Sequence, residues 1–143
     1  MIGCKWFIGG TDNGDAVAIR RRVFIEEQGI AEEIELDGTD GDAIHLVAYD
    51  GEKPVATGRI MLYGAEAHIG RVAVPAEERG KGYGDFIMRV LVYKCCEMDY
   101  TYQVVHAQLS ARGFYEKLGF SQEGGVFDEA GIPHVTMTHE GYC

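Results

Sequence analysis

The sequence predicts one α+β domain over residues 1–143, with a mixed, mostly antiparallel sheet flanked by helices. First, 46% of the 143 residues are apolar, which is enough for one hydrophobic core without metal or disulfide support. Second, strand-like segments joined by short turns fill residues 44–74 and the chain after residue 120. Third, a helical period begins at Gly82 between two strand-like segments, which predicts one parallel crossover in the same sheet.

Residues 15–28 predict the first helix. Their apolar side chains recur at helical spacing, Asp15 is a candidate N-cap, and Arg22 is spaced to pair with Glu26 four residues on. The three arginines at 20–22 are expected to pair with nearby acids rather than to form a cofactor-facing patch.

Three strand-like segments joined by tight turns come next. They cover residues 44–49, 55–62 and 67–74. Asp50 and Gly51 form a strong hairpin signal between the first two, and Pro75 ends the third. These segments therefore predict an antiparallel run of three strands.

The second half of the chain alternates helix and strand. A long helix starts at Gly82, residues 101–107 are strand-like, and residues 110–120 predict a short helix with Gly119 as its C-cap. Two further strands meet at a turn over residues 128–133. This order predicts the parallel crossover around the long helix.

The charge balance argues against polyanionic partners. Against 13 Lys and Arg stand 23 Asp and Glu, a net charge of -10, so neither duplex nucleic acid nor an anionic membrane surface is an expected partner. Residues 26–42 hold eight of the acids and no Lys or Arg. This acidic segment predicts either an attraction for a cationic partner or a solvated loop.

The four cysteines, at positions 4, 95, 96 and 143, lack the C-x-x-C spacing of a metal site, so we expect reduced thiols and no metal. The first residues do not resemble a signal peptide, and no segment reaches the length of a membrane span. These observations predict a soluble, cytoplasmic protein.

A glycine-rich turn precedes the long helix and predicts an anion-binding site. Gly80, Gly82 and Gly84 allow close approach of a ligand, the helix start supplies unpaired N–H groups, and Arg79 and Lys81 add positive charge. The turn lacks the G-K-[ST] ending of a nucleotide P-loop and the third glycine of a dinucleotide fingerprint. A purely structural turn remains the alternative.

Two segments of the chain resemble the signatures of the GNAT superfamily of acyl-CoA-dependent N-acyltransferases. Residues 79–84, RGKGYG, match its [RQ]-x-x-G-x-[GA] loop, and residues 114–120, FYEKLGF, match its second signature. The resemblance covers about residues 15 to 140. Four shorter segments are similar to the small bacterial ElaA-like branch: residues 20–28, 69–72, 107–108 and 131–134.

The resemblance implies acetyl-CoA as the acyl donor and assigns roles to individual residues. The backbone of Val72, Ala73 and Val74 would bind the pantetheine arm. Gln108 stands where many members have an Asn that contacts the cofactor, and Tyr115 would be the catalytic acid. The residues expected around the pyrophosphate are Arg79, Gly80, Lys81, Gly82, Tyr83, Gly84 and Asp85.

The general base is less clearly marked. His68 is the first candidate, because it lies on the strand leading to the cofactor and shares a face, by alternation, with Gly70 and Val72. A packed or exposed strand histidine is the equally weighted alternative. Other candidates are Glu26, Glu27 and Asp37, whereas His45 and His134 are expected to be structural.

Together these features predict an N-acetyltransferase that acts by direct attack of a primary amine, without a covalent enzyme intermediate. The alternatives are a non-catalytic acyl-CoA-binding or regulatory module and, third, a different nucleotide-binding protein. We expect the acceptor to be a small amine or a basic peptide terminus. A homodimer formed through sheet edges stays open.

Overall fold

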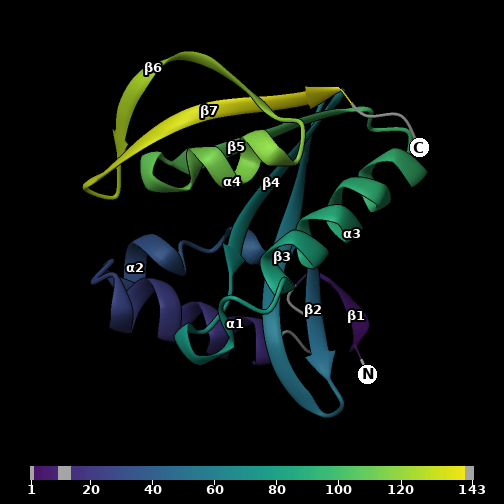
Figure 1. The fold of residues 1–143 in the computed structure, drawn as a ribbon, viewed down its shortest axis with the longest axis vertical. Helices are drawn as coiled ribbons and strands as arrows, with labels where there is room; N and C mark the ends of the chain where they lie inside the picture. The colour runs from purple at the N-terminus through teal and green to yellow at the C-terminus, as the bar shows by residue number, and fades with distance from the viewer. Residues whose placement is uncertain (1, 10–13, 141–143) are drawn as a thin grey trace.

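The computed structural model describes residues 2–9 and 14–140, and one seven-stranded sheet forms its centre (Figure 1). The strands are β1 (Ile2–Ile8), β2 (Ile44–Asp50), β3 (Lys53–Tyr63), β4 (Glu66–Ala73), β5 (Tyr102–Gln108), β6 (Ser121–Glu129) and β7 (Ile132–Glu140). They lie in the order β1-β2-β3-β4-β5-β7-β6, and each neighbouring pair is antiparallel except β4 and β5. The predicted α+β class and parallel crossover are confirmed.

Helices cover both faces of this sheet (Figure 1). They are α1 (Gly14–Arg20), which continues as a π-helical segment (Arg21–Glu27), α2 (Glu32–Glu35), α3 (Tyr83–Glu97) and α4 (Arg112–Lys117). Alternation along β2 divides the core, because Leu46 and Ala48 pack with α3 whereas Val47 and Tyr49 pack with α1. The two helix layers thus bury opposite faces of the same strands.

Two expectations about the N-terminal part were wrong. The sequence analysis missed β1, because this edge strand leaves most of its side chains exposed and shows no clean apolar alternation. Asp15, the expected N-cap, instead lies in the first turn of α1, where its carboxylate accepts a hydrogen bond from the Tyr49 hydroxyl at 2.6 Å. The Cys143 prediction lies outside the described residues.

The predicted first helix changes its winding halfway. The segment Arg21–Glu27 is π-helical, and the N–H of Gln28 bonds to the carbonyl of Val23, five residues earlier, at 3.1 Å. This wider turn misaligns side chains four residues apart. The predicted pair of Arg22 with Glu26 is therefore wrong, and Arg22 pairs with Glu77 at 2.7 Å.

The parallel strands β4 and β5 diverge partway along their length. Their pairing runs from Glu66 opposite Tyr102 to Ile69 opposite Val105, although β4 extends to Ala73 and β5 to Gln108. On the side that faces β5, the β4 edge beyond Ile69 therefore pairs with no strand among the described residues.

A β-bulge in β4 accompanies this divergence. Between the pairs Thr57–Ala73 and Arg59–Gly70, β3 has one residue and β4 has two, Arg71 and Val72. Arg71 takes a left-handed conformation, with φ of 53°. The extra residue reverses the alternation, so Val72 packs on the α3 side. The expectation that His68 shares a face with Val72 is wrong for this reason, although Gly70 does line the cleft beside His68.

Candidate active site

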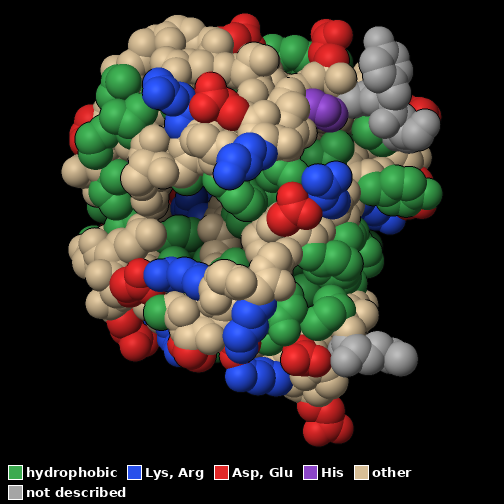
Figure 2. Space-filling view, in the orientation of Figure 1, with side chains coloured by type: hydrophobic (Ala, Val, Ile, Leu, Met, Phe, Trp, Pro, Cys, Tyr) green, Lys and Arg blue, Asp and Glu red, His purple; other side chains and the backbone are tan. Residues whose placement is uncertain are grey.

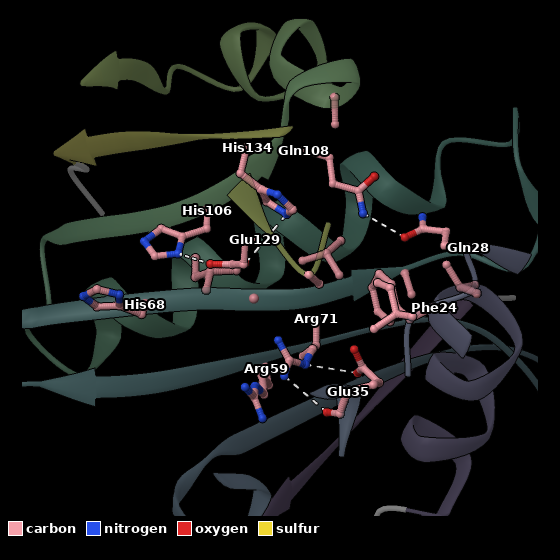
Figure 3. Close-up of a pocket in the computed structure, with 18 of the residues that line it drawn as sticks. Phe24, Gln28, Glu35, Arg59, His68, Arg71, His106, Gln108, Glu129 and His134 are labelled. Carbon is pink, nitrogen blue, oxygen red and sulfur yellow. Dashed lines mark hydrogen bonds and ion pairs between the residues drawn. The ribbon is translucent and has the colours of Figure 1, made fainter. Parts of the chain in front are cut away.

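A cleft of about 880 Å³ opens where β4 and β5 separate. Its walls come from β3, β4 and β5, from the π-helical segment and from α4. The hollow is visible near the middle of the surface in Figure 2, and Figure 3 shows charged and polar side chains reaching into it from several elements. Residues far apart in the sequence meet there.

The free edge of β4 forms one wall of this cleft. Val72, Ala73 and Val74, the residues expected to bind pantetheine, all line the cleft. Beyond Ile69, the side of β4 that faces β5 has backbone groups with no strand partner. An extended ligand with amide groups can occupy the place of the missing strand by pairing with them.

The glycine-rich turn brings unpaired N–H groups to one end of the cleft. Gly82 is the N-cap of α3 and provides no side-chain cap, and the first bond of the helix runs from the Phe86 N–H to the Gly82 carbonyl at 3.0 Å. Gly80 and Gly82 have φ of 77° and 84°, and a Cβ at either would meet no described atom within 4 Å. Gly84 instead packs closely, 3.4 Å from the Phe114 ring to the position of its Cβ. The helix end thus has open space and donors suited to a phosphate.

The side chains of this turn are held in pairs. Arg79 binds the Glu27 carboxylate at 2.7 and 2.8 Å and the Val74 carbonyl at 3.0 Å, while Lys81 binds Glu78 at 2.9 Å. The hydrogen bond to Glu27 raises the pKa of Arg79. The predicted local excess of positive charge is therefore wrong, because acids balance both cations.

The remaining side chains of the turn also have partners. The Tyr83 hydroxyl lies 3.4 Å from an Asp50 carboxylate oxygen, and Asp85 accepts a bond from Arg89 at 2.7 Å. An anion at this helix end would thus meet mainly backbone donors.

Tyr115 lies on α4 and lines the same cleft as Gly84. Its ring packs edge-on against Phe114 and Phe120, with centroids 5.0 and 5.9 Å away. Burial raises the pKa of Tyr115 to about 12, and within the described ranges no residue hydrogen-bonds to its hydroxyl. The phenol is therefore protonated at neutral pH and can donate to a ligand.

Gln108 and Gln28 close one side of the cleft. The Gln108 side-chain amide donates to the Gln28 side-chain oxygen at 2.8 Å, which joins β5 to the residue after the π-helical segment (Figure 3). Each amide has further donors and acceptors for a ligand.

Three histidines line the cleft (Figure 3). The His68 ring meets the His106 ring edge-on, with centroids 6.4 Å apart, and Nε2 of His68 lies 2.9 Å from Glu66. Glu129 lies between the other two, 2.9 Å from Nδ1 of His106 and 3.7 Å from Nε2 of His134. Sequence analysis missed Glu129, because in the sequence it is one more polar residue of a hairpin turn.

His134 and His45 were both expected to be structural, and the structure separates them. Nδ1 of His134 lies 2.7 Å from the Ile132 carbonyl and must donate to it, which leaves Nε2 of the neutral ring as an acceptor in the cleft. His45 is buried and its Nε2 contacts the Asp40 carbonyl at 3.1 Å, so its structural role is confirmed.

The acidic segment at residues 26–42 contributes to a buried cluster of ion pairs. Glu35 and Asp40, both from this segment, bind the guanidinium groups of Arg20, Arg59 and Arg71. Burial opposes ionisation of Asp40, but its hydrogen bonds and charge interactions with Arg20 and Arg59 outweigh this and lower its pKa. Both expectations for this segment, a solvated loop or a site for a cationic partner, were therefore wrong for these two acids.

The carboxylates named as other base candidates lie in different surroundings. Glu26 is exposed and Glu27 is paired with Arg79, whereas Asp37 lines the cleft with Oδ1 bound by the Thr39 hydroxyl at 2.6 Å.

Within residues 2–9 and 14–140, no three His, Cys, Asp or Glu side chains are grouped to hold a metal ion. No helix in the same ranges is long and apolar enough to span a membrane.

Comparison with known proteins gives concordant matches. Residues 13–140 match the family model described as acetyltransferase (GNAT) domain. Protein YyaT of Bacillus subtilis (strain 168) is 39% identical over 90% of this chain and 89% of its own length. Protein ElaA of Escherichia coli (strain K12) is 30% identical over 85% of this chain and 83% of its own.

Solved structures share the fold over almost the whole chain. The crystal structure of Escherichia coli ElaA matches with a TM-score of 0.86 and 27% identity, covering 98% of this chain and 100% of that one. A GNAT family acetyltransferase from Elizabethkingia anophelis with acetyl-CoA bound has the same fold, with a TM-score of 0.75, 16% identity and 97% of each chain covered. The expected resemblance to ElaA is confirmed.

Proposed function

The chain belongs to the GNAT acetyltransferase family, and from this premise we propose that it transfers an acetyl group from acetyl-CoA to a primary amine by direct attack. One observation carries the proposal: the unpartnered edge of β4 lies beside the uncapped start of α3. The edge suits the amides of pantetheine, and the helix start suits its pyrophosphate. The fold neighbour with acetyl-CoA bound supports the same donor.

Each residue of the proposed donor site has a role that its position allows. The backbone of Val72, Ala73 and Val74 pairs with the pantetheine arm, and the Gln108 amide contacts it from β5. The turn at residues 79–85 binds the pyrophosphate, mainly through its N–H groups, because Arg79 and Lys81 are already paired.

The reaction needs a neutral amine and a protonated leaving group. When bound, acetyl-CoA supplies the thioester whose carbonyl carbon the amine attacks. The amine nitrogen bonds to that carbon, the C–S bond breaks and the amine gives a proton to a base. The departing sulfur accepts a hydrogen bond from Tyr115, the proposed acid, and then takes up a proton from water. The Val72 N–H is the proposed donor to the carbonyl oxygen, because Val72 lines the cleft. Deprotonating an alkylamine of pKa about 10.4 at pH 7 takes about 4.6 kcal/mol, so the base has the larger task.

Two histidines are proposed for the base. His68, the expected candidate, is 30% exposed and has Glu66 as its partner. We add His134, which has a fixed tautomer, lies opposite Gln108 in the β5–β7 register and has the Glu129 carboxylate 3.7 Å from its Nε2. These contacts favour His134.

Calorimetric titration with acetyl-CoA and an assay of free thiol release with a panel of primary amines test the proposal. We expect binding of CoA and acetyl-CoA, and thiol release that requires an amine. Gly82→Ala should weaken CoA binding about tenfold or more, because a side chain strains the left-handed turn and moves its N–H groups. Gly124→Ala is the matched control, since Gly124 has φ of 75° and equally open surroundings in β6.

Failure to bind CoA would refute the donor assignment. Binding without thiol release for any amine would favour a non-catalytic acyl-CoA-binding module. We also propose a cytoplasmic location, which the thiol state of Cys4, Cys95 and Cys96 supports.

A further inference from the structure

Two arginines on the acceptor side of the cleft have donors left over from their internal ion pairs. Arg59 on β3 and Arg71 on β4 both line the cleft, and they are adjacent in Figure 3. Arg59 is only 7% exposed, so it has little access to bulk water. A buried guanidinium is stable only when its N–H groups find acceptors.

The hydrogen bonds of the cluster show which donors are committed. Arg20 uses all three of its nitrogens, on Glu35 Oε2 at 2.7 Å, Asp40 Oδ1 at 2.8 Å and the Glu35 carbonyl at 3.0 Å. Arg59 uses only Nη1, on Asp40 at 2.9 Å and on Thr39 at 3.0 Å. Its Nε and Nη2 bind no residue in the described part of the chain.

Arg71 is similarly incomplete. Its Nε lies 3.0 Å from Glu35 Oε2 without hydrogen-bond geometry, its Nη2 donates to the Glu35 carbonyl at 3.2 Å, and Nη1 has no partner in residues 2–9 and 14–140. Arg71 also has the left-handed backbone at the bulge, a conformation that side chains rarely adopt. The bulge therefore turns this guanidinium toward the cleft at the price of backbone strain.

The charges of the cluster leave room for one more anion. Three guanidinium groups share two carboxylates, that of Glu35, which is buried, and that of Asp40, which is half-buried. The third nearby carboxylate, Asp37, is 41% exposed and lies 3.6 Å from Arg71, so water weakens that pair. Burial lowers the pKa of Arg59, and the charges of Arg71 and Arg20 lower it further.

We propose that the acceptor amine carries a carboxylate, which Arg59 and Arg71 bind, and that the substrate is therefore an α-amino acid. The inference rests on the proposed acetyltransferase function and names its acceptor class. Arg71 directly precedes Val72, where the carbonyl oxygen is proposed to bind, and both residues line the same cleft, so a carboxylate held by Arg71 and the thioester would share that cleft. Apolar residues of the same cleft, among them Phe24 and Met61, can receive the amino-acid side chain.

The test compares matched acceptors in the thiol-release assay. Each L-amino acid of a panel is paired with its carboxamide, which keeps the amine and side chain but lacks the anion. The amide substituent lowers the amine pKa, so more of that amine is neutral and the bias runs against the proposal. For the best acceptor we expect kcat/KM to exceed that of its amide by about 10- to 150-fold, the factor for a charge-assisted hydrogen bond.

Variants test whether Arg71 causes the preference for the amino acid over its amide. Arg71→Gln should abolish the preference for the acid over the amide while CoA affinity is retained, and Arg71→Lys should keep part of it. Arg112 is an exposed arginine of α4 that pairs with Gln122. As the control, Arg112→Gln should change neither the preference for the acid over the amide nor the affinity for CoA. Thermal unfolding checks that each variant folds, and the wild-type comparison does not depend on any variant.

Equal or better kcat/KM for the amides in the wild-type protein overturns this proposal and leaves the acetyltransferase function intact. Survival of the preference in folded Arg71→Gln also overturns it. If no amine releases thiol, a binding measurement tests the anion site instead. Calorimetry then measures whether the CoA complex of the protein binds 4-methylpentanoate, a carboxylate without an amine. Binding that Arg71→Gln removes supports the anion site, and lack of binding overturns it.

Discussion

The replacement Tyr115→Phe tests the acid of the proposed reaction with little disturbance of the fold. The variant removes one hydroxyl and keeps the ring contacts with Phe114 and Phe120. Since no residue in the described ranges hydrogen-bonds to that hydroxyl, the free energy of unfolding should change by less than about 0.5 kcal/mol. A change in activity can then be assigned to chemistry.

The raised pKa of Tyr115 sets the size of the effect. A phenol of pKa about 12 is a weak donor to a free thiolate of pKa about 8.5, and complete proton transfer between them is uphill by about 4.8 kcal/mol. Tyr115 should therefore act mainly through a hydrogen bond to the charged sulfur, worth about 1.5 to 3 kcal/mol, or about 10- to 150-fold in kcat. It should cause no alkaline limb in the rate profile below about pH 11.

Thiol release at saturating acetyl-CoA measures kcat, and calorimetry measures CoA affinity, which should stay within twofold. Tyr93→Phe is the control, because Tyr93 is 62% exposed on α3. A fall in kcat of less than twofold would show that Tyr115 is not the donor. A fall matched by a large loss of stability would show that the hydroxyl has a structural role instead.

Three further predictions concern the base, the ion-pair cluster and the packing beneath the bulge. His134→Gln should lower kcat/KM by about 10²- to 10⁴-fold and His68→Gln by much less, and the reverse order would restore His68 as the base. Asp40→Asn should destabilise the fold by about 1.5 to 3 kcal/mol at pH 7, measured by urea unfolding, because it weakens two charge-assisted hydrogen bonds to a half-buried carboxylate. Because folding lowers the pKa of Asp40, its contribution is present above about pH 4 and is lost as pH falls further, so the difference from wild type should narrow in acid. Gly58→Ala should cost about 1 to 3 kcal/mol of stability, since its Cβ would lie 2.6 Å from Cδ1 of the buried Leu91; an unchanged melting temperature would contradict this packing.

The fold was predictable from the sequence where the signals were local. The Asp50-Gly51 hairpin, the stop at Pro75 and the start of α3 after Gly82 are all set by residues with strong conformational preferences. β1 was not predicted, because an edge strand needs no apolar alternation and its pairing with β2 spans a long separation in sequence. The π-helical segment was not predicted, because a helical apolar pattern does not show whether the backbone is wound as an α-helix or a π-helix.

The candidate site was predictable in its residues but not in the contacts between their side chains. Residues 72–74 line the cleft as expected, and so do His68, Gln108 and Tyr115, whereas of the predicted turn residues 79–85 the lining includes Arg79 and Gly84. The pairing of Arg79 with Glu27 joins residues 52 positions apart, and the contact of Glu129 with His106 joins residues 23 apart. Such partners depend on the tertiary fold, which neither spacing nor composition encodes.

One extra residue in β4 links the donor and acceptor halves of the cleft. The bulge adds Arg71 opposite Gly58, and beyond Ile69 the strand edge faces β5 without a partner. The same residue supplies the guanidinium that approaches Glu35, and the glycine opposite it admits Leu91 of α3 at close range. Removing the bulge by deletion would restore alternation, turn Arg71 away from the cleft and bring β4 back toward pairing with β5, so donor and acceptor binding should be lost together.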